Sequence, residues 1–107
     1  MSFSAHFLDT PPTREQVDST TQATVIEFGA PWCGYCLAAQ PLIESALQSY
    51  SSVQHLKIED GKGKALGRSF RVKLWPTLIF MKGGIEVERL VRPTEQEVIE
   101  KALGKIA

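Results

Sequence analysis

The chain has 107 residues with 12 basic and 12 acidic side chains, so its formal net charge at neutral pH is zero. This length allows one hydrophobic core and is too short for two, so residues 1–107 are expected to form a single domain. The balanced charge argues against a nucleic-acid or membrane-surface binder, and no stretch approaches the ~20 apolar residues of a membrane span.

The N-terminal residues Met1 to Phe7 contain neither a basic region nor an apolar run of signal-peptide length. We therefore expect a cytoplasmic protein. In that compartment a single pair of cysteines is more often catalytic or metal-binding than a structural disulfide.

The first predicted elements are a short helix and a buried strand. Thr13 and Gln16 have the spacing of a capping box, which predicts a helix that begins after Thr13. The apolar run from Val25 to Phe28 predicts a central strand that is apolar on both faces except at Glu27.

Both cysteines, Cys33 and Cys36, follow this strand directly. Apolar residues then recur at helical spacing as far as Tyr50, which predicts a helix over 33–50. Pro41 removes one backbone donor inside this helix and should bend it near Leu37.

The next segment, 53–59, predicts a short strand with Leu56 and Ile58 on one side and His55 and Lys57 on the other. The glycine- and lysine-rich stretch 61–67 predicts a frayed helix that ends near Phe70.

The last part of the chain predicts a hairpin and a helix. Strands over 77–81 and 85–91 flank Gly83-Gly84, a strong signal for an antiparallel hairpin. Thr94 and Glu97 have the spacing of a second capping box, which predicts a helix over 94–103.

The predicted order is helix, strand, helix, strand, helix, strand, strand, helix, with an optional strand at the start. The early strands are joined by helices, which predicts right-handed parallel crossovers. The fold class is therefore α/β, with a central mixed sheet and helices on both faces.

The cysteine pair carries the clearest chemistry. Its i, i+3 spacing in a first helical turn places the Cα atoms about 5 Å apart, inside the range of about 4.4–6.8 Å that a disulfide requires. A helix N-terminus favours a thiolate, so Cys33 is the expected nucleophile. Cys36 lies further into the helix and is the expected resolving thiol.

The alternative is a zinc site. A structural zinc normally takes four protein ligands, whereas this chain offers two cysteines with His6 and His55 at no finger-like spacing. The metal interpretation is therefore disfavoured, and both histidines are interpreted as residues without a role.

Glu27 is the second candidate. A carboxylate in an apolar strand is costly unless it is hydrogen-bonded or neutralised. Burial favours the neutral form, and this suits Glu27 to general acid/base work on Cys36. The alternative is a structural Glu–Lys pair at a sheet edge.

The segment Trp32-Cys33-Gly34-Tyr35-Cys36, placed between a buried strand and a helix, resembles the active site of the thioredoxin family. Pro41, Lys57, Phe70, Val72 and Pro76-Thr77 also stand at matching places, and the similarity runs from about Val25 to the C-terminus. The resemblance implies a single thioredoxin-like domain over residues 1–107.

The resemblance also assigns roles to further residues. In thioredoxins an Asp at the place of Glu27 is thought to relay protons to the second cysteine, and Lys57 on the neighbouring strand is its implied partner. Pro76 resembles the family's cis-proline, which faces the cysteines and leaves the backbone of Trp75 free to pair with an extended substrate. The alternative is a trans proline that starts the strand at Thr77.

Two positions near the cysteines depart from the family. Gly29 stands where thioredoxins usually carry a large Trp, and Trp75 stands where they carry a small or β-branched residue. We hypothesise that Trp75 fills the volume vacated at Gly29 and covers the rim of the active site. Trp32 flanks Cys33 and is expected to shape the docking surface.

Two further departures concern partners. Arg92-Pro93 replaces the family's Gly-Ala and places a long cation on an expected flat apolar surface, which questions recognition by an ordinary thioredoxin reductase. Gly34-Tyr35 replaces Gly-Pro between the cysteines and tunes the potential of the pair. Gly-Tyr also occurs in thioredoxin-fold isomerases, so the direction of electron flow stays open.

The resulting interpretation is a thiol–disulfide oxidoreductase that reduces protein disulfides through Cys33 and Cys36. It needs no bound cofactor or metal. A thioredoxin-reductase-like enzyme or another thiol would supply electrons, and the protein is expected to be a monomer. The alternatives are an isomerase or oxidase of the same fold, and a binding module in which the cysteines are incidental.

Overall fold

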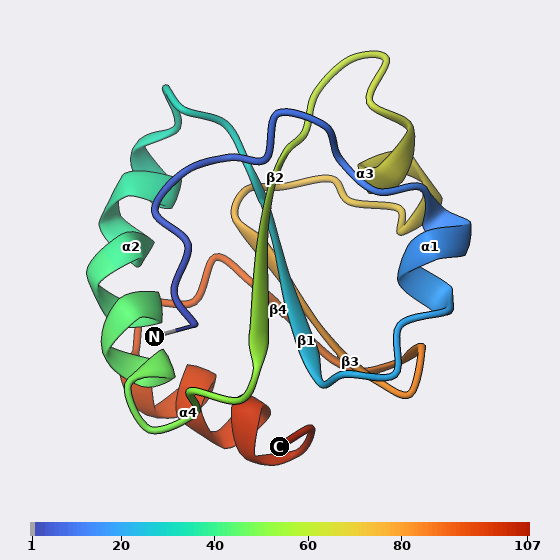
Figure 1. The fold of residues 1–107 in the computed structure, drawn as a ribbon. Helices are drawn as coiled ribbons and strands as arrows, with labels where there is room; N and C mark the ends of the chain where they lie inside the picture. Colours follow the sequence, from blue (N-terminus) through green and yellow to red (C-terminus); the bar gives the residue numbers. More distant parts are fainter. Residues whose placement is uncertain (1) are drawn as a thin grey trace.

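The computed structural model describes residues 2–107 and follows the predicted order of elements (Figure 1). The elements are α1 (Arg14–Asp18), β1 (Thr24–Gly29), α2 (Gly34–Leu47), β2 (Gln54–Glu59), α3 (Ala65–Ser69), β3 (Thr77–Lys82), β4 (Ile85–Val91) and α4 (Gln96–Gly104). The optional strand before α1 is absent from the described part of the chain.

The four strands form one sheet in the order β2-β1-β3-β4. β1 pairs in parallel with β2, and its other neighbour β3 is antiparallel to it, as β4 is to β3. The prediction of a mixed sheet with a final hairpin is confirmed. The parallel crossover, however, is limited to β1–α2–β2, because β3 runs against β1 and the connection through α3 therefore reverses direction.

Helices cover both faces of the sheet, as predicted (Figure 1). Every residue of β1 is buried, and the side chains alternate between two core clusters. Val25 belongs to the cluster with α2 and α4, and Ile26 and Phe28 belong to the cluster with α1 and α3. This alternation places Glu27 on the α2 face of the sheet.

Of the two capping boxes predicted from the sequence, the one at the first helix forms and the one at the last helix does not. The capping box of α1 forms, with Gln16 N donating to Thr13 Oγ1 at 3.1 Å. The capping box predicted for α4 is wrong. This helix begins at Gln96 with Glu95 as its N-cap, so Glu97 occupies the second helical position and cannot close a box with Thr94.

Helix α2 is the longest helix among residues 2–107 and is also shorter than predicted. It begins one residue after Cys33, which is its N-cap, and ends at Leu47 instead of Tyr50. No helix in the described chain is long and apolar enough to cross a membrane.

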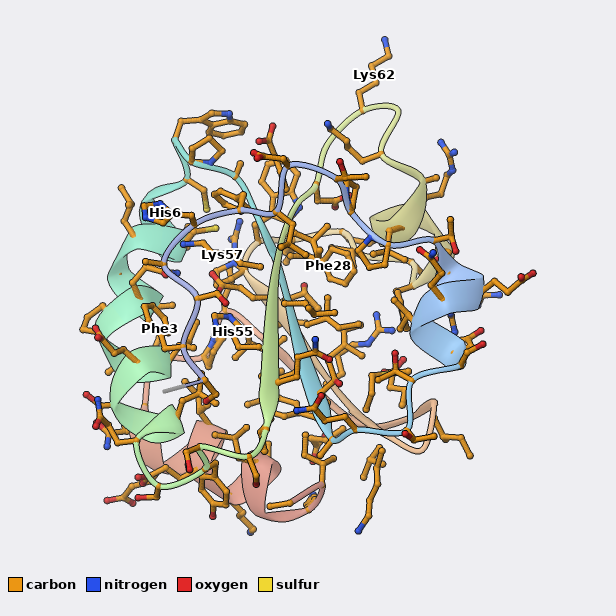
Figure 2. The ribbon with its side chains drawn as sticks, viewed as in Figure 1. Phe3, His6, Phe28, His55, Lys57 and Lys62 are labelled. Atoms are coloured by element: carbon orange, nitrogen blue, oxygen red, sulfur yellow. The ribbon has the colours of Figure 1, made fainter. Side chains whose placement is uncertain are left out.

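The N-terminal segment, residues 2–8, lies along β2 and α2 (Figure 2). Ser4 N donates to His55 Nδ1 at 2.8 Å, and Leu8 N donates to Lys57 O at 2.9 Å. The ring of Phe3 stacks on His55 with a centroid separation of 5.3 Å. The segment therefore covers the polar side chains that β2 directs toward α2.

The hairpin between β3 and β4 generates a stability prediction with an internal control. Gly83 and Gly84 both have positive φ, +59° and +77°, so alanine at either place incurs the left-handed penalty of roughly 1–2 kcal/mol. A Cβ on Gly84 would also collide with the carbonyl of Asp18, whereas a Cβ on Gly83 meets nothing within 4 Å. Gly84→Ala should therefore destabilise the protein more than Gly83→Ala in urea denaturation, and equal losses would contradict this packing of the hairpin on α1.

Candidate active site

Cys33 and Cys36 lie at the N-terminus of α2, and both are free thiols. Cys33 is the N-cap residue, and the backbone N–H of Cys36 donates to its Sγ at 3.2 Å. Cys33 is 7% exposed and Cys36 is 3% exposed. The first cysteine thus receives a backbone N–H and the positive end of the helix dipole, both of which stabilise a thiolate.

Cys36 lies behind Cys33 against the end of β1. A Cβ on Gly29 would come within 2.7 Å of Cys36 Sγ, so the absence of a side chain there makes room for this sulfur. The pKa of Cys36 is raised to about 12, mainly by burial and then by the hydrogen bond with Cys33 and the charges of Cys33 and Glu27, while a backbone hydrogen bond with Ala30 opposes the rise. At neutral pH Cys36 therefore holds its proton.

Glu27 is fully buried, and its carboxylate is held by two side chains. Gln40 Nε2 donates to Oε2 at 2.7 Å, and His55 Nε2 lies 2.9 Å from Oε1. The backbone N–H of Ser4 can only donate, so His55 Nδ1 must accept and His55 Nε2 carries the ring proton. The pair is therefore a neutral histidine that donates to a carboxylate.

Gln40 connects Glu27 to two other groups. Its Nε2 also donates to the carbonyl of Cys36 at 3.0 Å, and its Oε1 accepts from Lys57 Nζ at 2.8 Å. The direct Glu27–Lys57 pair suggested by their adjacent positions on β1 and β2 does not form. The Gln40 side chain lies between Lys57 and Glu27, because its amide oxygen accepts from the Lys57 ammonium and its amide nitrogen donates to the Glu27 carboxylate.

A cavity of about 270 Å³ opens beside Cys36, between the N-terminal segment and the start of α2. Gln40 and Lys57 line it, and so does His6. Figure 2 shows His55 and Lys57 on the α2 side of the sheet, opposite Phe28. The cavity has room for water next to the buried thiol.

Trp75 and Pro76 face the cysteines from the other side. Their peptide bond is cis, as the resemblance implied. The carbonyl oxygen of Trp75 lies 3.9 Å from Cys33 Sγ, and Trp75 Nε1 donates to Asp60 Oδ2 at 2.9 Å.

Cys36 Sγ, and not Trp75, occupies the space directly beside Gly29, so Trp75 does not fill the position of the missing Cβ. Trp75 instead packs against Ala30 and both cysteines. It therefore does cover the rim, but from the side of Cys33.

The outer surface around Cys33 is aromatic and open. Trp32 is 74% exposed, Tyr35 is 59% exposed, and a Cβ on Gly34 would meet nothing within 4 Å. The rings of Trp32 and Trp75 form a T-shaped contact with centroids 5.5 Å apart. The structure thus brings the residues predicted to form the docking surface together around Cys33.

Sequence reasoning missed His55 and Gln40. His55 lies two residues before Lys57 on β2, and Gln40 lies four residues after Cys36 on α2, so each shares a face with a residue already singled out. Those spacings were the available signal. Among residues 2–107, no group of three or more His, Cys, Asp or Glu side chains could hold a metal ion.

Comparison with known proteins relates this geometry to one family. The sequence model of the family described as Thioredoxin matches residues 7–105. Thioredoxin H2-1 of Oryza sativa subsp. japonica is 32% identical over 88 residues, which cover 82% of this chain and 63% of that protein. The chain therefore spans less than two thirds of this relative, but it covers 98% of Thioredoxin 1 of Nostoc sp., which is 26% identical over 106 residues.

The fold also agrees with solved structures. Thioredoxin 2 from Pseudomonas aeruginosa PAO1 in its reduced form superposes with a TM-score of 0.84 at 44% identity, covering 96% of this chain and 99% of that one. The predicted thioredoxin fold, a central mixed sheet with helices on both faces, is thereby confirmed. By sequence and by fold, this chain belongs to the thioredoxin family.

Proposed function

We propose that the protein is a thiol–disulfide oxidoreductase that reduces protein disulfides through Cys33 and Cys36. The observation that carries this proposal is the asymmetry of the pair. An N-capping sulfur receives a backbone N–H at 3.2 Å, and behind it lies a buried thiol whose pKa is raised to about 12 by burial. Such a pair supplies one nucleophile and one protonated reserve thiol.

The reaction transfers two electrons in two exchange steps. The Cys33 thiolate attacks one sulfur of the substrate disulfide, which forms a mixed disulfide and releases the other substrate sulfur as a thiolate that takes up a proton. Cys36 then loses its proton and attacks Cys33 Sγ. The Cys33–Cys36 disulfide forms, and the second substrate sulfur leaves as a thiol.

Glu27 is the proposed base for the second step. In the mixed disulfide the hydrogen bond that the Cys36 thiol donates to Cys33 no longer opposes ionisation of Cys36, while burial and the charge of Glu27 still do. The cavity beside Cys36 gives the proton a path toward the Gln40 network. Lys57 acts there as the partner of the relay, through Gln40.

The aromatic surface around Cys33 is the proposed substrate site. Trp32, Gly34 and Tyr35 present it on one side, and Trp75 and Pro76 on the other. The backbone of Trp75 can pair with an extended segment of a substrate in the manner of a short added strand.

The chemistry needs no bound cofactor, because the electrons reside on the two sulfurs. Electrons would return from a thioredoxin-reductase-like enzyme or another thiol. We propose that the protein works as a monomer in the cytoplasm on protein disulfides.

Substitution of each cysteine tests the order of the two steps. Cys36→Ser removes the resolving thiol, so we expect a mixed disulfide with a disulfide-containing protein such as insulin to accumulate at Cys33. Cys33→Ser should form no adduct and should lose turnover with dithiothreitol as the electron donor. Intact-mass spectrometry measures both. An adduct on Cys36 of the Cys33→Ser protein at the rate of the wild-type reaction would reverse the roles.

Substitution of Glu27 tests the relay. Without the carboxylate, ionisation of Cys36 depends on the solvent, and the thiolate fraction rises about tenfold per pH unit below the thiol pKa. The resolving rate of Glu27→Gln should therefore be lowest at pH 6 and rise steeply toward pH 9, whereas the wild-type profile should be flatter. Stopped-flow kinetics measures the step.

Two controls accompany this experiment. Glu44→Gln removes an exposed carboxylate from the same helix and should leave the profile unchanged. In Glu27→Gln the new amide NH₂ group faces either His55 Nε2 or Gln40 Nε2, and each of these is itself a hydrogen-bond donor. One hydrogen bond is therefore lost, and we also expect the unfolding free energy to fall by roughly 1–3 kcal/mol. If the folded variant resolves at the wild-type rate from pH 6 to 9, Glu27 has no relay role.

A further inference from the structure

Arg92 follows the last strand and lies directly beside the Trp75–Pro76 peptide. Its backbone N–H donates to the carbonyl of Pro76 at 2.8 Å, and its φ of +51° is in the left-handed region that favours glycine. A long side chain thus stands at a backbone position where it is conformationally disfavoured.

The Arg92 side chain bridges two parts of the docking surface. Its Nε donates to the carbonyl of Trp75 at 2.8 Å, and its guanidinium carbon lies 4.0 Å from the centroid of the Tyr35 ring. The same carbonyl is 3.9 Å from Cys33 Sγ. The cation is therefore one carbonyl group away from the nucleophile.

No carboxylate within the described chain pairs with Arg92. By contrast, Arg14 pairs with Asp18, and Arg89 pairs with Glu86 at 2.8 Å. A guanidinium has five N–H donors in a planar fork that suits a carboxylate. The remaining donors of Arg92 are free of ion pairs beside the active site.

We propose that Arg92 selects substrates that carry an acidic side chain next to the attacked cysteine. This inference rests on the proposed reduction of disulfides. A substrate segment that adds to the backbone of Trp75 competes with Arg92 for the carbonyl. An acidic neighbour restores the lost contact as an ion pair, whereas a neutral or basic neighbour does not.

The charge on the far side of Trp75 acts in the same direction. A depression next to α3 is lined by basic side chains, and its one carboxylate among the described residues, Asp60, is engaged by the Trp75 indole. The basic side chains are Lys62, Lys64, Arg68, Arg71 and Lys73. Figure 2 shows Lys62 extending from the tip of the loop between β2 and α3. A positive field of this kind steers acidic partners toward the site.

The test uses three synthetic disulfide-linked peptide dimers that differ only in the residue next to cysteine, which is Glu, Gln or Lys. Second-order rate constants are measured with pre-reduced protein in single turnover, at low and at high salt. The wild-type protein should prefer the Glu peptide to the Lys peptide by about tenfold or more at low salt, and salt should reduce the ratio.

Variants separate Arg92 from the overall charge. In Arg92→Gln the rate constant for the Glu peptide should be within about twofold of the rate constant for the Lys peptide. The rate constant for the Gln peptide should rise, because the Trp75 carbonyl is released. Arg92→Lys keeps the charge without the planar fork and should give an intermediate ratio. Arg89→Gln also removes one positive charge from β4, and it should retain the wild-type ratio.

Circular dichroism checks that each variant is folded. Arg92→Gly serves as a second variant that lacks the side chain, because glycine adopts the observed φ freely. The inference is overturned if wild type does not distinguish the peptides, if Arg92→Gln and Arg92→Gly both keep the wild-type ratio, or if Arg89→Gln loses that ratio to the same extent. If wild type reduces none of the three peptides, the proposed function itself fails. The two failures are therefore distinguishable.

Discussion

The structure around the cysteines depends on one constraint, a carboxylate fully buried in the central strand. Glu27 has no contact with bulk water, so its two oxygens need donors from the protein. Gln40 from α2 and His55 from β2 supply them, and the N-terminal segment supports His55 from outside. Satisfying one buried charge thus determines how α2, β2 and the N-terminus fit together.

The active site has two sides that meet at the cysteines. The carboxylate side contains Glu27 and Gln40 and reaches Cys36 through the helix N-terminus and the adjacent cavity. The aromatic side contains Trp75 and Arg92 and reaches Cys33 through one carbonyl oxygen. This division gives each cysteine its own environment, although only two residues separate them.

Much of this arrangement could be predicted from sequence because it depends on local signals. The cysteine spacing, the Gly83-Gly84 turn and the buried position of Glu27 each follow from a short pattern, and the structure has all three. His55 could not be assigned, because its role depends on the register of β2 against β1, which a strand pattern alone leaves open. The start of α4 differs from the prediction because Thr94 and Glu97 have the spacing of a capping box, whereas the helix begins at Gln96 and its N-cap Glu95 makes no side-chain cap hydrogen bond.

The reduction potential of the Cys33–Cys36 pair tests the central claim most directly. Strong oxidants of this chemistry owe their potential to a stabilised reduced form. Here one backbone N–H and the helix dipole favour a Cys33 thiolate, whereas burial and a neighbouring carboxylate oppose ionisation of Cys36, so stabilisation of the reduced form is limited to the first sulfur. Equilibration with glutathione or dithiothreitol buffers should therefore give a value near about –270 mV, as for thioredoxin. A value of about –180 mV or higher would contradict the account and indicate an oxidase or isomerase.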